Sequence, residues 1–316
     1  MTADKPPLIV LLAAPRGFCA GVERAVAMVE QALVRFGAPV YVRREIVHNR
    51  FVVEQLAAQG AIFVSELDEV PENGVVVFSA HGVSQAVKQE AARRRLKVLD
   101  ATCPLVTKVH REAIRQECAG RHVILIGHRG HPEVIGTLGQ LPPGTITLVE
   151  TLQDAAQIVP PPDRDLAYVT QTTLALDEVN AIVGILLRRF PGITGPRSQD
   201  ICYATTNRQQ AVKVLAPQVD AILVVGSPNS SNSQRLVETA RAAGCERSQL
   251  VCRTAEIDWP SLQGARRLGV TAGASAPEVL VQEVLAACRA RYDVTVEIFS
   301  VIEEDVHFRL PRALSA

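Results

Sequence analysis

The sequence lacks a charge excess of either sign, because 33 basic residues balance 33 acidic ones among its 316 residues. Proteins that bind nucleic acid usually present a basic surface that neutralises phosphates, so this class is not expected. The one dense basic run, residues 93–95, comes late in an Ala-rich helical pattern, where cations suit the negative end of the helix dipole. A disordered chain is also excluded, because 47% of the residues are hydrophobic and only 21% are charged.

Long apolar runs are also missing. The longest early one, residues 8–14, is far shorter than the roughly 20 residues that a membrane-spanning helix needs. No basic segment typical of a secretory signal precedes it, since Lys5 is the only lysine there. We therefore expect a protein of the reducing cytoplasm with no membrane partner. In that compartment its seven cysteines are more often free, metal-binding or catalytic than paired in disulfides.

Several common motifs do not occur. The sequence has no Cys-x-x-Cys pair, which argues against zinc ribbons and thioredoxin-like chemistry. It has no Walker-type phosphate loop, and its anion-suited turns contain almost no lysine, so an ordinary ATPase is not expected. The absence of a G-x-G-x-x-G loop argues against direct binding of a nicotinamide cofactor.

What the sequence does contain is a repeating unit, in which an apolar strand-like run leads into a small, polar or Gly-rich turn and then into a helical pattern. Strands that alternate with helices predict an α/β fold with parallel sheets. So many short units, with a Pro/Gly-rich linker at 191–196, favour several small α/β domains over one wide sheet. The strand-like runs are residues 8–14, 75–78, 98–101, 123–126, 168–169, 222–225 and 268–270.

Residues of unusual chemistry follow these strand-like runs. In open α/β sheets, ligands collect beyond the carboxyl ends of the strands, so one shared cleft could hold them all. These residues are Cys19, His81, Cys103, His131, Thr172, Ser230, Asn232 and Ser275.

Three cysteines, Cys19, Cys103 and Cys202, lie in such turns or lead into a helix. Three thiolates from separate segments can converge on one iron–sulfur cluster and leave one iron without a protein thiolate. An open iron can act as a Lewis acid, and helix N-termini help to keep thiolates ionised. The spacing alone favours the other interpretation, in which all three are small buried hydrophobic side chains. The other four cysteines are expected to be structural, namely Cys118, Cys245, Cys252 and Cys288.

A second group of polar residues lies where helices begin, and exposed backbone N–H groups there bind phosphate readily. Ser and Asn are also ordinary helix N-caps, so the residues alone leave both interpretations open. Glu133 has two interpretations as well, because an acid in the first helical turn suits the dipole, whereas near a substrate it could be a general acid. The residues of this group are Ser230, Ser231, Asn232 and Ser275, to which His48 and His81 could add ring donors.

Taken together, nine segments resemble one family, the 4-hydroxy-3-methylbut-2-enyl diphosphate reductases of the non-mevalonate isoprenoid pathway. The segments follow in order along nearly the whole chain. Pro228 is the one departure noted, since some relatives have a basic residue at this position. The segments are residues 16–22, 45–49, 79–82, 100–104, 127–134, 170–173, 200–207, 229–233 and 273–278.

The resemblance implies three α/β domains in an approximate threefold arrangement around one 4Fe–4S cluster. The expected domains are residues 1–97 with Cys19, 98–195 with Cys103 and 196–290 with Cys202, followed by a C-terminal tail at 291–316. Each of the three cysteines would supply one thiolate, and the substrate hydroxyl would bind the open iron.

The resemblance also implies the reaction and the substrate contacts. Glu133 and Thr172 would form a proton network, and His131 would contact the substrate. Two electrons, from a ferredoxin or flavodoxin, and two protons would convert (E)-4-hydroxy-3-methylbut-2-enyl diphosphate to isopentenyl and dimethylallyl diphosphate. The diphosphate would lie among His48, His81, Ser230, Ser231, Asn232 and Ser275.

Two alternatives remain open. An iron–sulfur redox sensor without turnover would explain the thiolates, but not the anion-suited turns or Glu133. A hydrolase that uses Cys103 as nucleophile and a histidine as base would be colourless and active without iron.

Overall fold

The computed structural model describes residues 5–312 and 314. Contacts within the chain divide it into two compact units, and each is built from segments that are distant in sequence. Among the described residues, the first unit takes in Lys5–Ala20, His48–Arg50 and Tyr203–His307, whereas the second takes in Gly21–Val47, Phe51–Cys202, Phe308–Arg312 and Leu314.

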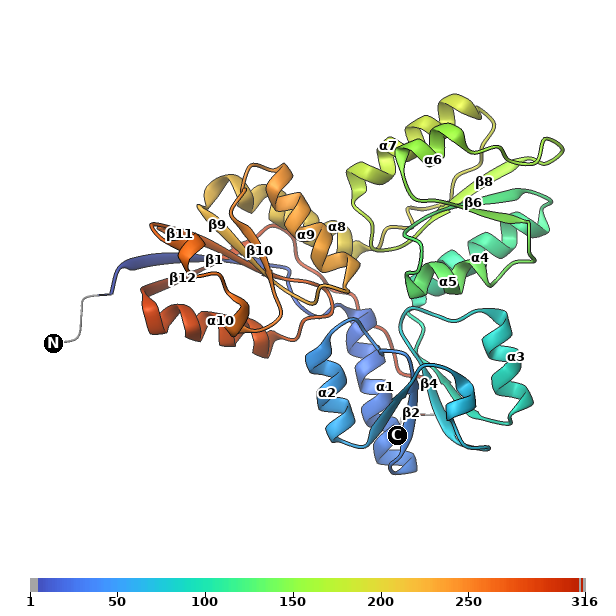
Figure 1. The fold of residues 1–316 in the computed structure, drawn as a ribbon, viewed down its shortest axis with the longest axis horizontal. Coiled ribbons are helices and arrows are strands. Elements are labelled where there is room, and N and C mark those ends of the chain that lie inside the picture. The colour runs from blue at the N-terminus through green and yellow to red at the C-terminus, as the bar shows by residue number, and fades with distance from the viewer. Residues whose placement is uncertain (1–4, 313, 315–316) are drawn as a thin grey trace. The chain divides into compact units, whose positions relative to one another are not determined.

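The first unit is built on a five-stranded parallel sheet with the strand order β10–β9–β11–β1–β12. Strands β9 and β11 are almost continuously apolar and buried, as expected for parallel strands covered on both faces. Helices α8 and α9 pack on one face and α10 on the other (Figure 1). The strands are β1 (Pro7–Ala14), β9 (Ala221–Val225), β10 (Ser248–Val251), β11 (Arg267–Ala272) and β12 (Asp293–Ser300), and the helices are α8 (Tyr203–Leu215), α9 (Ser231–Ala242) and α10 (Glu278–Arg291).

The second unit contains two smaller parallel sheets. The first of these has the order β3–β2–β4–β5 and is surrounded by α1, α2 and α3 (Figure 1). Its strands are β2 (Val40–Arg43), β3 (Ala61–Val64), β4 (Val75–Phe78) and β5 (Lys97–Asp100), and the helices are α1 (Ala20–Phe36), α2 (Arg50–Ala58) and α3 (Gln85–Arg93).

The other sheet of this unit has the order β7–β6–β8. Alternate residues of its central strand point to opposite faces. Val123 and Leu125 therefore pack with α4, whereas Ile124 and Ile126 pack with α7. The elements are β6 (His122–Ile126), β7 (Ile146–Val149), β8 (Leu166–Thr170), α4 (Pro104–Cys118), α5 (Pro132–Leu138), α6 (Leu152–Gln157) and α7 (Leu176–Arg189).

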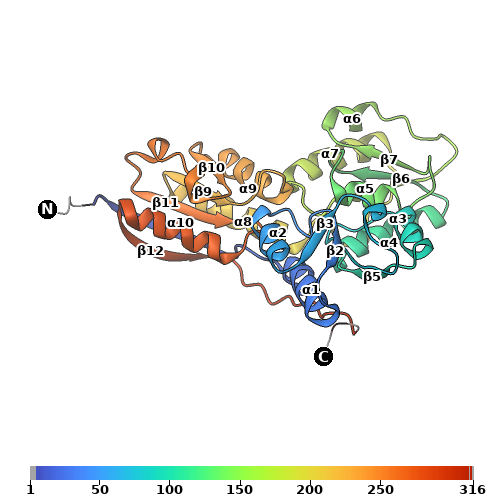
Figure 2. The same cartoon turned by 60° about the horizontal axis from the view of Figure 1, so that its bottom comes forward.

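The predicted fold class is confirmed, because the chain forms three small parallel sheets with helices between their strands. All seven predicted strand-like runs are strands. The domain boundaries stay a prediction, although at both chain ends strands of one predicted domain pair with strands of another. Strand β1, expected in the first domain, pairs with β11, and β12, expected in a C-terminal tail, pairs with β1 along its whole length. Figure 2 shows β12 along the edge of this sheet, next to α10.

Within residues 5–312 and 314, no helix combines the length and the apolar character that crossing a bilayer requires.

Candidate functional site

The three cysteines predicted as cluster ligands share one local position, directly before the first residue of a helix. Cys19 precedes α1, Cys103 is the N-cap of α4, and Cys202 precedes α8. All three are half-buried. The partial positive charge of a helix N-terminus favours a thiolate over a thiol, so the fold gives all three the same advantage as metal ligands.

The other four cysteines have different surroundings. Cys118 is the last residue of α4, where the dipole is negative, and is exposed. Burial raises the pKa of Cys288 to about 11 and also raises the pKa of Cys245 and Cys252. A thiol that is kept neutral is a poor metal ligand. These environments favour the structural role expected for them.

The donor chemistry of the first three cysteines fits an iron–sulfur cluster, since soft thiolates are the ligands that such clusters use. Cys19 belongs to the first unit, whereas Cys103 and Cys202 belong to the second. Among the residues that the structure describes, no group of three or more His, Cys, Asp or Glu side chains is arranged to hold a metal ion. The ligand set therefore stays a proposal.

The turns that follow β9 and β11 lie next to each other, because Val225 pairs with Ala272 at the ends of these strands. Ser230 is the N-cap of α9 and accepts the backbone N–H of Ser233 at 3.4 Å. The capping interpretation of Ser230 is thereby confirmed. Asn232 joins the two turns, since its Oδ1 accepts the backbone N–H of Ala274 at 2.8 Å.

Two glycines allow these turns to approach closely. A Cβ added at Gly226 would lie 2.2 Å from the Oγ of Ser233, and one added at Gly273 would lie 2.1 Å from the same atom. Both distances are too short for real atoms, so the buried hydroxyl of Ser233 fits only because both positions are glycine. The result is a compact group of polar side chains, Ser230, Asn232 and Ser233, which we call the polar floor. It lies at the carboxyl edge of the sheet, where ligands of α/β proteins collect.

His48 joins this edge although it lies far away in sequence. The hydroxyl of Ser275 donates to the backbone carbonyl of His48 at 2.9 Å, and the side-chain nitrogen of Asn229 lies 3.5 Å from His48 Nδ1. The structure thus brings together five of the six residues predicted to hold a diphosphate, whereas His81 belongs to the second unit. The five are His48, Ser230, Ser231, Asn232 and Ser275, and all but the half-buried His48 are buried.

Glu133 lies in the first turn of α5 with its side chain 2% exposed. Its carboxyl accepts two hydrogen bonds from Thr172, from the backbone N–H at 2.6 Å and from the hydroxyl at 2.8 Å. Burial raises the pKa of Glu133 to about 7, the two hydrogen bonds oppose this rise, and the nearby charge of Asp200 adds to it. A carboxyl with such a pKa can hold and release a proton near neutral pH.

Two histidines of the second unit, His131 and His81, lie at or next to the start of α5, the helix that carries Glu133. His131 is the N-cap of α5, and its Nδ1 accepts the backbone N–H of Glu133 at 3.2 Å. The ring of His81 lies edge-on to that of His131, with 5.8 Å between the ring centroids. The hydroxyl of Ser79 lies 3.3 Å from His81 Nδ1.

Backbone hydrogen bonds connect these residues to two of the cysteines. The N–H of Cys103 donates to the carbonyl of Ala80 at 2.9 Å, next to His81. The N–H of Cys202 donates to the carbonyl of Thr172 at 3.0 Å, and Thr172 is the partner of Glu133. The six predicted site residues of the second unit are therefore linked by short contacts, directly or through the neighbouring Ala80, rather than scattered.

Asp200 was not predicted as a site residue, although it lies in one of the recognised segments. Its carboxyl is fully buried, accepts the backbone N–H of Thr170 at 3.1 Å and lies 3.3 Å from the ammonium of Lys108. Burial raises the pKa of Asp200, while Lys108 opposes that rise. The only signal in the sequence was its position two residues before a turn cysteine, and this does not reveal burial.

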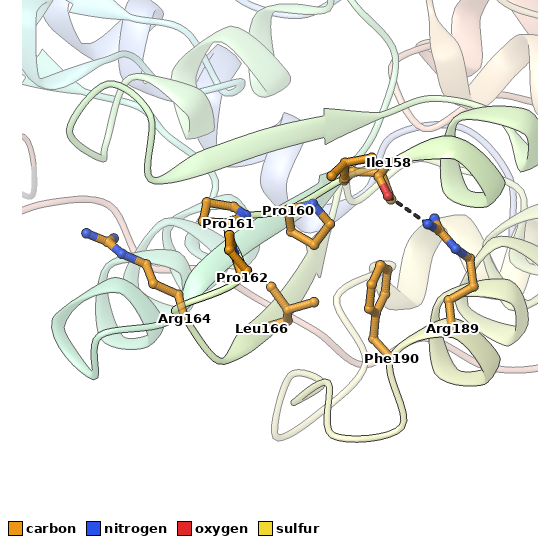
Figure 3. A pocket seen from close by; sticks show the side chains of 9 residues that line it. Ile158, Pro160, Pro161, Pro162, Arg164, Leu166, Arg189 and Phe190 are labelled. Atoms are coloured by element: carbon orange, nitrogen blue, oxygen red, sulfur yellow. Dashed lines mark hydrogen bonds between the residues drawn. The ribbon is translucent and has the colours of Figure 1, made fainter.

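A hollow of about 320 Å³ lies away from the predicted site residues (Figure 3). Its wall contains three consecutive prolines, residues 160–162, and the ring of Phe190. Arg189 lies at its side and donates to the carbonyl of Ile158 at 2.8 Å. No predicted site residue lines this hollow, so it does not contribute to the candidate site.

The three small parallel sheets define an α/β protein, with cysteines at helix starts and polar turns beyond the strand ends. A family model described as LytB protein matches residues 10–289. The chain therefore belongs to the LytB family.

Similar proteins match this chain over nearly its whole length. A protein of Paracoccus denitrificans named 4-hydroxy-3-methylbut-2-enyl diphosphate reductase is 61% identical over 310 residues, which are 98% of each chain. A protein of the same name from Ruegeria pomeroyi is 59% identical over 98% of each chain. The solved structure of the E-1-hydroxy-2-methyl-but-2-enyl-4-diphosphate reductase from Plasmodium falciparum matches with a TM-score of 0.94 and 37% identity, covering 98% of this chain and 97% of that one.

Proposed function

We propose that this chain reduces (E)-4-hydroxy-3-methylbut-2-enyl diphosphate to isopentenyl diphosphate and dimethylallyl diphosphate. The observation that carries this proposal is the 61% identity, over 98% of both chains, to a reductase named for that substrate. The reaction breaks the carbon–oxygen bond of the allylic alcohol and forms a carbon–hydrogen bond. It consumes two electrons and two protons, and the oxygen leaves as water.

The electrons require a redox group, and we propose that Cys19, Cys103 and Cys202 hold one 4Fe–4S cluster. The shared helix-start position of these cysteines supports this ligand set. When bound, the cluster would deliver the electrons and act as a Lewis acid towards the substrate hydroxyl. A ferredoxin or flavodoxin is the electron donor that we propose, in the reducing cytoplasm that the cysteine content favours.

We propose that the substrate's diphosphate binds at the polar floor beyond β9 and β11. Ser230 accepts hydrogen bonds from the backbone N–H and the hydroxyl of Ser233, so its own O–H can donate to an anion. Asn232 uses Oδ1 for Ala274 and donates one amide hydrogen to the hydroxyl of Thr205 at 3.5 Å, which leaves its second amide hydrogen to offer. Hydrogen bonds to a charged group are worth roughly 1.5–3 kcal/mol each, so several neutral donors can hold a diphosphate without lysine.

Proton delivery is the role that we propose for Glu133. The two hydrogen bonds from Thr172 fix its carboxyl, and burial keeps it protonated at neutral pH in a substantial fraction of molecules. His131 and His81 would complete the substrate contacts in the second unit. Each protein group would thus bind, orient or protonate the substrate.

Anaerobic reconstitution with iron and sulfide, followed by a turnover assay with a chemically reduced viologen dye, tests this function. We expect a brown protein that forms both isopentenyl and dimethylallyl diphosphate. A coloured protein without turnover would favour the redox sensor, whereas activity in iron-free protein would favour the hydrolase. The Cys118→Ser variant serves as the control, since this exposed thiol lies at a helix end.

A further inference from the structure

Three basic side chains contact the turns that precede the three helix-start cysteines. Each basic residue lies in the first turns of a helix that itself follows one of these cysteines, but it contacts the turn before a different cysteine. The residues are Arg24 in α1, Lys108 in α4 and Arg208 in α8.

Arg208 holds the turn before Cys19. Its side chain is fully buried, and its Nε and Nη2 donate to the carbonyl of Gly17 at 3.2 and 2.8 Å. Nη2 also donates to the carbonyl of Phe18 at 3.3 Å. Glu304 balances the charge, with its Oε1 3.0 Å from Nη1. An unpaired buried cation would cost several kcal/mol, so this pairing explains why the guanidinium can stay there.

Arg24 holds the turn before Cys103. Its Nη1 donates to the carbonyls of Ala101 and Thr102 at 3.3 and 3.2 Å. Its Nε donates to the carbonyl of Arg309 at 3.2 Å. The guanidinium therefore joins the residue directly before the cysteine to the C-terminal segment.

Lys108 holds the turn before Cys202. Its ammonium donates to the carbonyls of Ser198 and Gln199 at 3.0 and 2.6 Å. It also lies 3.3 Å from the buried carboxylate of Asp200. Three oxygens from consecutive residues thus surround one cation.

The contacts form a cycle. The helix after Cys19 holds the turn before Cys103, the helix after Cys103 holds the turn before Cys202, and the helix after Cys202 holds the turn before Cys19. Carbonyl oxygens that precede a helix have no partner inside it, and a cation with several donors can fix two or three of them at once.

We propose that Arg24, Lys108 and Arg208 are positioning residues, each of which fixes one cysteine turn in the conformation that receives the cluster. This inference rests on the proposed ligand role of the three cysteines. A purely structural role predicts that removing the cation speeds hydrogen exchange throughout a unit. A positioning role predicts faster exchange only at the turn that the cation contacts. That turn is not the one before the cation's own helix.

Hydrogen exchange of the turn peptides separates the two roles. The variants are Arg24→Gln, Lys108→Met and Arg208→Gln, and Glu304→Gln is a milder variant in case Arg208→Gln does not fold. Arg115→Met, which removes only an ion pair with Glu112 within α4, is the control. Exchange is measured for peptides that cover 14–20, 98–104 and 196–203, in reconstituted protein and after iron has been removed by a chelator. The rate of iron loss to the chelator is measured in the same preparations.

Each variant should raise exchange roughly tenfold or more in the one turn that it contacts, as expected when charge-assisted hydrogen bonds are lost. It should also lose iron faster than the wild type, while the control should match the wild type in both respects. Exchange that rises uniformly, exchange that rises at the wrong turn, or an unchanged rate of iron loss would overturn the proposal. If the wild type itself takes up no iron, the proposed ligand role fails, and positioning for a cluster fails with it, even where the exchange pattern is local.

Discussion

Thr172 donates to both oxygens of the Glu133 carboxyl, through its backbone N–H at 2.6 Å and its hydroxyl at 2.8 Å. The side chain of Glu133 therefore points to a partner 39 residues away and not only along its own helix. This relationship favours proton transfer over a simple role at the helix start. It also makes both interpretations separable by experiment.

Glu133→Gln should abolish proton delivery while keeping the fold. The amide oxygen can accept the backbone N–H of Thr172, and the amide nitrogen can donate to its hydroxyl. We expect a near-normal melting temperature and cluster content, with kcat lowered by about 10²–10⁴-fold, the usual contribution of general acid catalysis. The measurement is kcat beside thermal stability in one preparation. Normal turnover with a lower melting temperature would show that Glu133 acts only at the helix end.

The activity of the wild type should fall as pH rises through about 7, because Glu133 loses its proton there. The hydroxyl of Thr172 lowers the pKa of this carboxyl, so Thr172→Val should move the falling limb of the kcat profile to higher pH. The pH profiles of both proteins test this. A limb that stays in place in Thr172→Val would mean that another group controls it.

The free energy of unfolding should also depend on pH through the raised pKa of Glu133. The pKa of Glu133 is about 7 in the folded chain against 4.5 for the free side chain, so the unfolded chain releases its proton first as pH rises. The wild type should therefore lose stability relative to Glu133→Gln between about pH 4.5 and 7, by an amount on the order of 3 kcal/mol. Melting temperatures of both proteins at pH 5 and pH 8 provide the comparison. A constant difference between the two proteins would contradict a raised pKa.

Replacing each helix-start cysteine should remove the cluster. Cys19→Ser, Cys103→Ser and Cys202→Ser should each lose iron and activity, because a hydroxyl is a poor substitute for a soft thiolate. Cys118→Ser and Cys288→Ser should keep both, since one lies at a helix C-terminus and the other is a buried thiol with a pKa of about 11. Iron per chain after anaerobic reconstitution decides the outcome. Full iron loading in all of the first three variants would refute the ligand assignment.

Ser275→Ala should weaken binding of the diphosphate. The hydroxyl of Ser275 donates to the carbonyl of His48, so its loss also frees the segment that carries this histidine. We expect a higher KM and weaker inhibition by inorganic pyrophosphate, with the cluster spectrum unchanged. Ser261→Ala is the matched control, because its hydroxyl bonds only within the turn at Asp258 and to Gln249 in the same unit. An unchanged KM and unchanged inhibition in Ser275→Ala would exclude this site.

The sequence predicted the elements whose signals are local. The amphipathic pattern after residue 19 predicts a helix as far as Phe36, where α1 ends. Pro132 and Pro277 predict helix starts, and they are the first residue of α5 and the N-cap of α10. Five strands were not predicted, and four of them have only four residues each, too few for a clear alternating pattern. They are β2, β3, β7, β10 and the longer edge strand β12.

Most of the predicted site residues were found because they follow strands, and the carboxyl ends of parallel strands collect ligands. Cys202 was found because it leads into a helix. Asp200 was not found, because its carboxyl accepts a backbone N–H. Arg24, Lys108 and Arg208 were not found, because they contact backbone carbonyls. Any residue supplies a backbone carbonyl, so such contacts leave no pattern in the sequence.

The sequence by itself determined the alternation of strands and helices, the position of Cys19, Cys103 and Cys202 before helices, and the family to which the chain belongs. These properties follow from neighbouring residues and from the motifs that they form. Only the tertiary structure decided that Pro7 pairs with Asp293 across one sheet, that Thr172 holds Glu133, and that burial raises the pKa of that carboxyl to about 7. Strand pairing and burial join residues that are far apart in the chain, and the free energy of such contacts is not a property of any local segment.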